Sequence, residues 1–273
     1  MREFHFDKAF QDVDRAEEPL LCMLYLDAIS ELDTVKAYKR HTHSILKPVP
    51  GDHVLDVGCG LGHDVHALSL LVGPSGAAMG VDRSRIMIEE AISRHSAANV
   101  EFHCASAESL PFDDFTFECC RADRTLQHLI EPDRAVREMY RVLKCGGRIV
   151  VAEPDYETLL IDAGDPGTTR RILSFYCDSL ANGRMGRRLP SCLFEAGFRG
   201  VQVSAHSFVF QDSEVAERAL GIKGAAARAL KAIVITPEEA GGWLDDIANS
   251  ATQGTMFCAL TGIITCGIKP EAS

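Results

Sequence analysis

The sequence predicts an α/β protein built on a doubly wound, mostly parallel sheet of seven strands, of which the last is antiparallel. Two observations carry this prediction. From residue 53 to residue 153, short apolar runs alternate with helical segments, which is the order of consecutive βαβ units. These runs lack a strict alternation of inward and outward residues, as expected for strands that are buried on both faces.

The expected elements follow in chain order. Five strands are expected in the core, at residues 53–58, 77–82, 100–104, 116–122 and 147–153. Helices are expected between them, at residues 63–72, 84–97, 123–129 and 132–143. Beyond Glu153 we expect helices at about 167–181, just before Gly197, at 212–233 and from Thr236 onward, and strands at 200–210 and 254–269. The last segment alternates apolar and small residues, as an antiparallel closing strand would.

The first 50 residues are expected to form a helical arm or lid on the main fold. One helix is expected to begin near Pro19, and a second is expected over Asp33–Leu46. The arm is too short to be a domain of its own. We therefore expect a single domain with an N-terminal arm (1–50), a cofactor-binding core (51–153) and a substrate-side region of helices and closing strands (154–273). The arm packs either on its own chain or against a second copy in a homodimer, and the sequence leaves the oligomeric state open.

Composition limits the possible partners. The chain has 273 residues, of which 46% are hydrophobic and 25% charged, and its formal net charge is -11. Such a charge disfavours nucleic acid and anionic membranes as partners. No apolar run is long enough to span a bilayer, and the N-terminal residues do not form a secretory signal. The ten cysteines include no C-x-x-C pair, so we expect reduced thiols, a cytoplasmic location and no metal site.

Two motifs predict a nucleoside-containing ligand. The first is the strand-to-helix turn from Gly58 to Gly62, where alternating glycines allow close approach of a ligand to the backbone. The second is Asp82, at the end of the expected second strand, whose carboxylate can accept both hydroxyls of a ribose lying across that turn. The alternative for Asp82 is to cap the following helix. A nicotinamide-binding fingerprint would need a further glycine at position 63, where this chain has His63.

Several stretches of the core also share the pattern of one family. They are residues 54–60 (VLDVGCG), 80–82 (GVD), 107–112 (AESLPF), 126–129 (LQHL) and 138–147 (EMYRVLKCGG). Together they resemble the class I S-adenosylmethionine-dependent methyltransferases, especially the small-molecule group that includes the ubiquinone/menaquinone C-methyltransferases. The resemblance covers about residues 50–153. It implies a Rossmann-like sheet, S-adenosylmethionine as the cofactor, and methyl transfer to carbon, nitrogen or oxygen of a small molecule.

The resemblance also implies roles for individual residues. The glycine turn and Asp56 would face the methionine end of the cofactor, Asp82 would hold the ribose, and Arg121 would offer its backbone carbonyl to the amino group. The family often has Asp where this chain has Ser106, so adenine recognition must be made differently there. The complete set of implied cofactor contacts is Asp56, Gly58, Gly60, Gly62, Asp82, Arg83, Met87, Ser106, Ala107, Glu108 and Arg121.

Methyl transfer requires few catalytic groups, because a sulfonium methyl group is already activated and mainly needs an aligned nucleophile. A base is required only when that nucleophile loses a proton. The candidate catalytic residues are His128, Glu153 and Asp123. The alternative for His128 is a hydrogen bond that fixes the following helix, and the alternative for Glu153 is a helix cap or an ion pair. The candidate substrate contacts are Tyr25, Arg124, Gln127, Tyr156 and Arg187. Two other functions stay open: a nicotinamide-dependent oxidoreductase and a non-catalytic cofactor-binding protein of the same fold.

Overall fold

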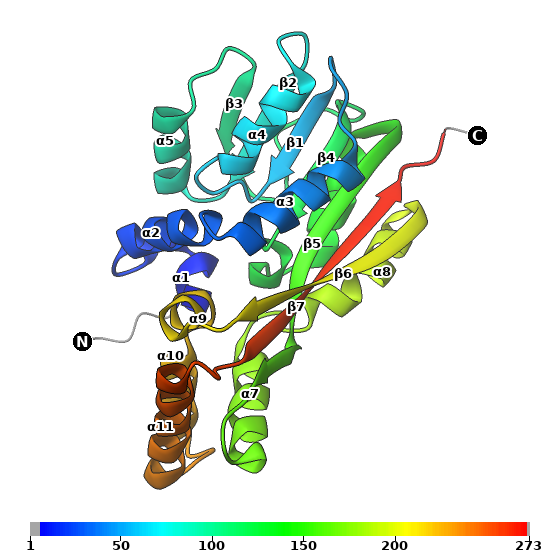
Figure 1. Cartoon of the computed structure of the whole chain (residues 1–273). Helices are drawn as coiled ribbons and strands as arrows, with labels where there is room; N and C mark the ends of the chain where they lie inside the picture. Colours follow the sequence, from blue (N-terminus) through cyan, green and yellow to red (C-terminus); the bar gives the residue numbers. More distant parts are fainter. Residues whose placement is uncertain (1–5, 272–273) are drawn as a thin grey trace.

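The apolar runs of the sequence form one twisted seven-stranded sheet in the computed structural model, which describes residues 6–271 (Figure 1). The strand order is β3-β2-β1-β4-β5-β7-β6. β7 is antiparallel to both of its neighbours, and the other paired strands are parallel. The strands are β1 (His53–Val57), β2 (Ala77–Asp82), β3 (Val100–Cys104), β4 (Phe117–Asp123), β5 (Leu143–Ile161), β6 (Arg199–Phe210) and β7 (Cys258–Ile268). The predicted fold class is confirmed.

Helices cover both faces of the sheet, which explains why its strands are apolar without alternation. One core joins Leu55 and Val57 of β1 to α6 (Pro132–Val142) and α8 (Met185–Ala196). The opposite core joins Val54 to α3 (Asp33–Leu46), α4 (His63–Val72) and α5 (Arg85–Arg94). Successive residues of β1 thus point into different cores.

A third core lies beyond one end of the sheet, below it in Figure 1. It is built by α7 (Pro166–Ser179), α9 (Ser213–Leu220), α10 (Ile222–Lys231) and α11 (Pro237–Gln253). Trp243 is buried there and donates its indole N–H to Thr169 Oγ1 at 2.9 Å. α11 begins with a complete capping box, in which Thr236 and Glu239 each accept the other's backbone N–H, as the sequence pattern predicts.

Of the arm expected over residues 1–50, α3 packs into the core on one face of the sheet. The name arm is kept below for α1 (Phe6–Gln11), the 3-10 helix η1 (Val13–Arg15) and α2 (Pro19–Ser30). The arm lies between α5 and α9, so it bridges the first half of the sheet and the third core (Figure 1). None of the helices between residues 6 and 271 is long and apolar enough to cross a membrane.

Three expected elements differ in the structure. The helix expected at 123–129 is instead the end of β4 followed by a 3-10 turn, η2 (Leu126–His128), because Arg124 has a φ of +52° and interrupts any helix. The helix expected at 212–233 is divided into α9 and α10 at Gly221, where φ is +61°. The fifth strand extends to Ile161, well past residue 153, because it pairs with β7 along this extension.

Candidate active site

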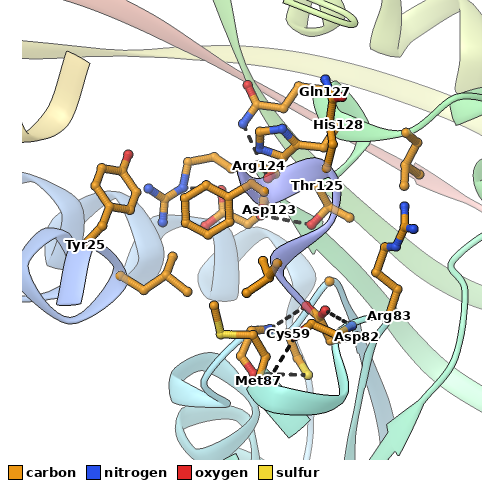
Figure 2. A pocket seen from close by; sticks show the side chains of 18 of the residues that line it. Tyr25, Cys59, Asp82, Arg83, Met87, Asp123, Arg124, Thr125, Gln127 and His128 are labelled. Atoms are coloured by element: carbon orange, nitrogen blue, oxygen red, sulfur yellow. Dashed lines mark hydrogen bonds and ion pairs between the residues drawn. The ribbon is translucent and has the colours of Figure 1, made fainter. Parts of the chain in front are cut away.

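A cavity of about 660 Å³ opens where the parallel strands end, between the core and the N-terminal arm. Open α/β sheets bind ligands at this edge, beyond the carboxyl ends of the strands. Its wall is formed by the glycine turn after β1, the ends of β2 and β4, the loop after β3, η2, the arm, and parts of α7, α9 and α10. Figure 2 shows Asp82, Cys59 and Met87 on one side of the cavity, with Arg124, Gln127 and His128 on the other.

The glycine turn combines positive φ angles with close packing. Gly58, Gly60 and Gly62 have φ values of +75°, +51° and +80°. A Cβ on Gly58 would overlap the side chain of Thr125, and a Cβ on Gly62 would lie 2.7 Å from the ring of Phe102. These two glycines are therefore required by the chain's own packing. A Cβ added at Gly60 would lie 3.2 Å from Leu26 of the arm, so the arm covers the turn.

Asp82 is aimed at the same turn. Its Oδ2 accepts a hydrogen bond from the backbone N–H of Gly60 at 3.0 Å, and its Oδ1 accepts one from Ser84 at 2.9 Å. Burial raises the pKa of Asp82, and the two backbone hydrogen bonds oppose this rise. A carboxylate has about four acceptor positions, so lone pairs remain for the hydroxyls of a ribose. The turn and the carboxylate thus fit an aminoacyl nucleoside such as S-adenosylmethionine.

Five further residues among the implied cofactor contacts also line the cavity: Arg83, Met87, Ser106, Ala107 and Glu108. Met87 is 1% exposed and belongs to a small core shared with the arm, so its side chain forms part of the cavity wall. These residues come from the start of α5 and the loop after β3, and the topology places both segments beside Asp82.

A buried ion network supports the methionine side of the cavity. The guanidinium of Arg121 is 1% exposed and contacts Asp56 at 2.8 Å, Asp123 at 3.0 Å and Asp64 at 3.4 Å. Burial raises the pKa of Asp56 to about 6, against the opposing effect of Arg121. Lys39 of α3 pairs with Asp64 at 2.6 Å. The resemblance implied only a backbone role for Arg121, whereas the structure shows its side chain in contact with three carboxylates.

The three candidate catalytic residues lie in different environments. His128 and Asp123 line the cavity, and Asp123 also accepts a hydrogen bond from the hydroxyl of Tyr38 at 3.0 Å. Glu153 is completely buried and does not line the cavity. Its Oε1 accepts the backbone N–H groups of Thr125 at 2.8 Å and Leu126 at 2.6 Å. This geometry gives Glu153 the structural role of capping η2.

Four of the five candidate substrate contacts line the cavity, and one does not. Tyr25, Arg124, Gln127 and Tyr156 line the cavity, and the guanidinium of Arg124 points toward Tyr25 (Figure 2). Arg187 does not line it. Its half-exposed guanidinium pairs with Asp155 and Glu157, so its charge is already compensated there.

Part of the wall could not be found from motifs. The arm contributes Phe10, Leu21 and Leu26, α7 contributes Tyr176, and α9 and α10 contribute Glu217, Lys223 and Arg228. No spacing or composition signal marks these residues in the sequence. Across residues 6–271, no group of three or more His, Cys, Asp or Glu side chains is arranged to hold a metal ion.

Comparison with known proteins identifies the family. Residues 48–181 match the family model described as a methyltransferase domain. An uncharacterized 37.1 kDa protein in transposon TN4556 of Streptomyces fradiae is 36% identical, over 87% of this chain and 68% of its own length. The demethylmenaquinone methyltransferase of Alkalihalophilus pseudofirmus is 31% identical, over 49% of this chain. This chain matches 58% of that relative's length.

A solved structure agrees in fold. Phosphoethanolamine N-methyltransferase 2 of Haemonchus contortus, in complex with phosphomonomethylethanolamine and S-adenosylhomocysteine, has a TM-score of 0.62 at 15% sequence identity. The likeness covers 96% of this chain and 60% of that one. With the strand order, the glycine turn and Asp82, these matches lead to one conclusion. Residues 48–181 form a methyltransferase domain, and the sequence and fold of the chain are similar to those of S-adenosylmethionine-dependent methyltransferases.

Proposed function

We propose that this protein transfers the methyl group of S-adenosylmethionine to a small-molecule acceptor bound in the half of the cavity away from Asp82. One observation carries the proposal: the cavity that contains the glycine turn and Asp82 continues without interruption to η2, α7, α9 and α10. The bound cofactor supplies an electrophilic methyl group. The remaining space can then hold an acceptor in line with it, which is the main requirement for this transfer.

The chain's own residues would orient both molecules and exclude water. The glycine turn and Asp82 hold the cofactor, while Phe10, Tyr25 and Leu26 of the arm cover the cavity. Closing the cavity in this way removes water that would otherwise compete for the site. Arg124, Gln127 and Tyr156 contact the acceptor, which completes the alignment.

His128 is the residue that we assign to proton transfer. Its imidazole lines the cavity from η2, and its ring centroid lies 5.8 Å from that of Phe10. A ring nitrogen accepts the proton that a hydroxyl or amine acceptor loses on methylation. Asp123 is a positioning residue instead, because Arg121 and Tyr38 already occupy its carboxylate.

The test is to incubate the protein with S-adenosylmethionine and a panel of phenols, amines and activated-carbon acceptors, and to measure release of S-adenosylhomocysteine. We expect turnover with at least one class. With that acceptor, His128→Asn should lower kcat by about 10²-fold while leaving the affinity for S-adenosylhomocysteine unchanged. Cofactor binding without turnover on the whole panel would favour the non-catalytic alternative. The family assignment removes the nicotinamide-dependent alternative.

A further inference from the structure

We propose that the ammonium group of Lys39, on α3, binds the carboxylate of the amino-acid end of the cofactor. The proposal rests on the proposed function, since it names a binding residue for the same cofactor in the same cavity. Lys39 belongs to none of the motifs of the core, yet it lines the cavity. Its place beside the glycine turn, its donor groups and the packing of α3 support the assignment.

The ammonium of Lys39 lies beside the start of α4, directly after the glycine turn. Its Nζ is 2.6 Å from Oδ2 of Asp64, which is in the first turn of that helix. The residue at the N-cap of α4 is Gly62, which has no side chain to cap the helix. The positive end of α4 therefore adds to the charge of Lys39, and together they favour a ligand carboxylate at this part of the wall.

The amino-acid end of S-adenosylmethionine carries an ammonium and a carboxylate, so it needs protein groups of both signs. The buried ion network beside the turn contains both. Its cation Arg121 contacts the carboxylates of Asp56, Asp64 and Asp123 within 3.4 Å, so its positive charge is shared among three acids. Lys39 pairs with only one acid of the described residues, Asp64. An ammonium has three N–H donors, so Lys39 retains donors for the oxygens of a ligand.

Asp64 does not depend on Lys39 alone for its compensation. Nη1 of Arg121 lies 3.4 Å from its Oδ2, and Nε2 of His43 lies 3.2 Å from its Oδ1. Asp64 can therefore hold Lys39 at the turn and still share its charge with other groups when a second carboxylate arrives. Its carboxylate orients the ammonium, and the ligand carboxylate takes the remaining donors.

The packing of α3 fixes the position of Lys39. The hydroxyl of Tyr38 donates a hydrogen bond to Asp123 at 3.0 Å, and Thr42 Oγ1 accepts one from Nε of Arg121 at 3.4 Å. These contacts dock α3 on the ion network on both sides of Lys39, whose own side chain is only 16% exposed. A side chain that is already held in place loses less conformational entropy when it binds a ligand.

The test compares two ligands that differ in one group. S-Adenosyl-3-thiopropylamine is S-adenosylhomocysteine without its carboxylate. Each is titrated by calorimetry into the native protein and into Lys39→Met, which removes the charge and keeps a long side chain. We expect the native protein to bind S-adenosylhomocysteine about tenfold more tightly than the decarboxylated ligand. Lys39→Met should weaken binding of S-adenosylhomocysteine by about tenfold and binding of the decarboxylated ligand by less than about twofold.

Lys36→Met is the matched control, because Lys36 lies on the same helix, pairs with Glu31 at 2.8 Å and does not line the cavity. It should leave both affinities unchanged. The double variant Lys39→Met/Asp64→Asn removes both charges of the pair, and it decides the outcome if Lys39→Met alone loses both ligands through misfolding. The preference for the carboxylate should be lost in the double variant too.

Equal weakening of both ligands in the double variant, or unchanged binding in Lys39→Met, would overturn the assignment. It would also be overturned if Arg124→Met abolished the preference for the carboxylate and Lys39→Met did not. Failure of the proposed function gives a different result, because the native protein would then bind neither ligand. Native binding with equal affinity for the two ligands would overturn only the role of Lys39.

Discussion

Asp14 of the arm accepts a hydrogen bond from the hydroxyl of Ser84 at 2.5 Å, although the two residues are 70 positions apart in the chain. The same carboxylate accepts the backbone N–H of Arg85 at 2.9 Å and of Ile86 at 3.3 Å. Asp14 therefore caps the first turn of α5, where a negative charge is favoured. Because Asp82 bonds the backbone of Ser84, docking of the arm is coupled to the ribose site.

Removing this charge should loosen the arm and the cofactor together. Asp14→Asn is expected to weaken binding of S-adenosylhomocysteine by about 3–10-fold, as the loss of a helix cap predicts, and to speed proteolysis of the arm. Calorimetry and limited trypsin digestion measure the two effects. Asp12→Asn, at an acid that pairs only loosely with Arg15, is the control. Equal affinities in both variants would contradict the coupling.

The same contact predicts a pH range for arm docking. Burial raises the pKa of Asp14, but its hydrogen bonds outweigh this effect and bring the pKa below its ordinary value of 3.8. The stabilisation is therefore complete above pH 3.8 and is lost only as the pH falls through the lower folded value. Proteolysis of the arm by an acid-active protease should stay slow down to about pH 4 and accelerate below it. Acceleration already near pH 6 would rule out Asp14 as the controlling group.

Asp82 is expected to dominate recognition of the ribose. Asp82→Asn keeps one oxygen for the turn but loses the charge, so binding of S-adenosylhomocysteine should weaken by about 10–100-fold. Asp113 is exposed, so Asp113→Asn is the matched control. This variant should bind S-adenosylhomocysteine with the affinity of the native protein. Calorimetry gives both affinities, and circular dichroism checks the fold. An unchanged affinity in Asp82→Asn would show that this carboxylate serves only to hold the backbone of Gly60 and Ser84.

Glu153 should control stability at neutral pH. Burial raises its pKa from 4.5 to about 8, so the folded state retains a proton that the unfolded chain releases. The stability contributed by this proton is complete below pH 4.5 and is lost as the pH rises to 8. Relative to Glu153→Gln, the free energy of unfolding of the native protein should therefore fall by about 2–4 kcal/mol over this range. Urea unfolding at about pH 5 and pH 8 measures it.

A matched acid separates this effect from the general response of the protein to pH. Glu157 is exposed and paired with Arg184 and Arg187, which lower its pKa. Glu157→Gln should therefore follow the native protein between about pH 5 and pH 8. If Glu153→Gln also follows it, the buried carboxyl does not carry the pH dependence.

Gly58 tests the packing of the turn. Gly58→Ala brings a Cβ into the side chain of Thr125 in addition to the cost of a positive φ, so we expect a loss of about 3 kcal/mol. Gly254→Ala, at a positive φ with open space around it, should cost only about 1–2 kcal/mol. The double variant Gly58→Ala/Thr125→Gly should recover most of the difference in denaturant unfolding. Absence of recovery would show that backbone strain, not overlap, is decisive.

Agreement between the sequence and the structure is greatest where the signal is local. The strand-to-helix turn at Gly58–Gly62 and the strand ending at Asp82 are short patterns, and the structure brings both to one cavity. The prediction of a helix over residues 123–129 was wrong. These residues have helical composition, but Arg124 adopts a positive φ. That conformation depends on contacts made after folding, such as its backbone bond to Ala152 of β5.

The sequence by itself determined the fold class of this protein and the turn where a ligand can approach the backbone, because strand–helix alternation and the glycine turn are properties of neighbouring residues. Only the tertiary structure decided which charged side chains line the cavity and which are buried away from it. It buried Glu153 against the N–H groups of η2, and it brought Lys223 and Arg228 to the cavity beside Tyr176. These residues come from separate helices and strands with no common spacing, so their meeting depends on how distant elements pack.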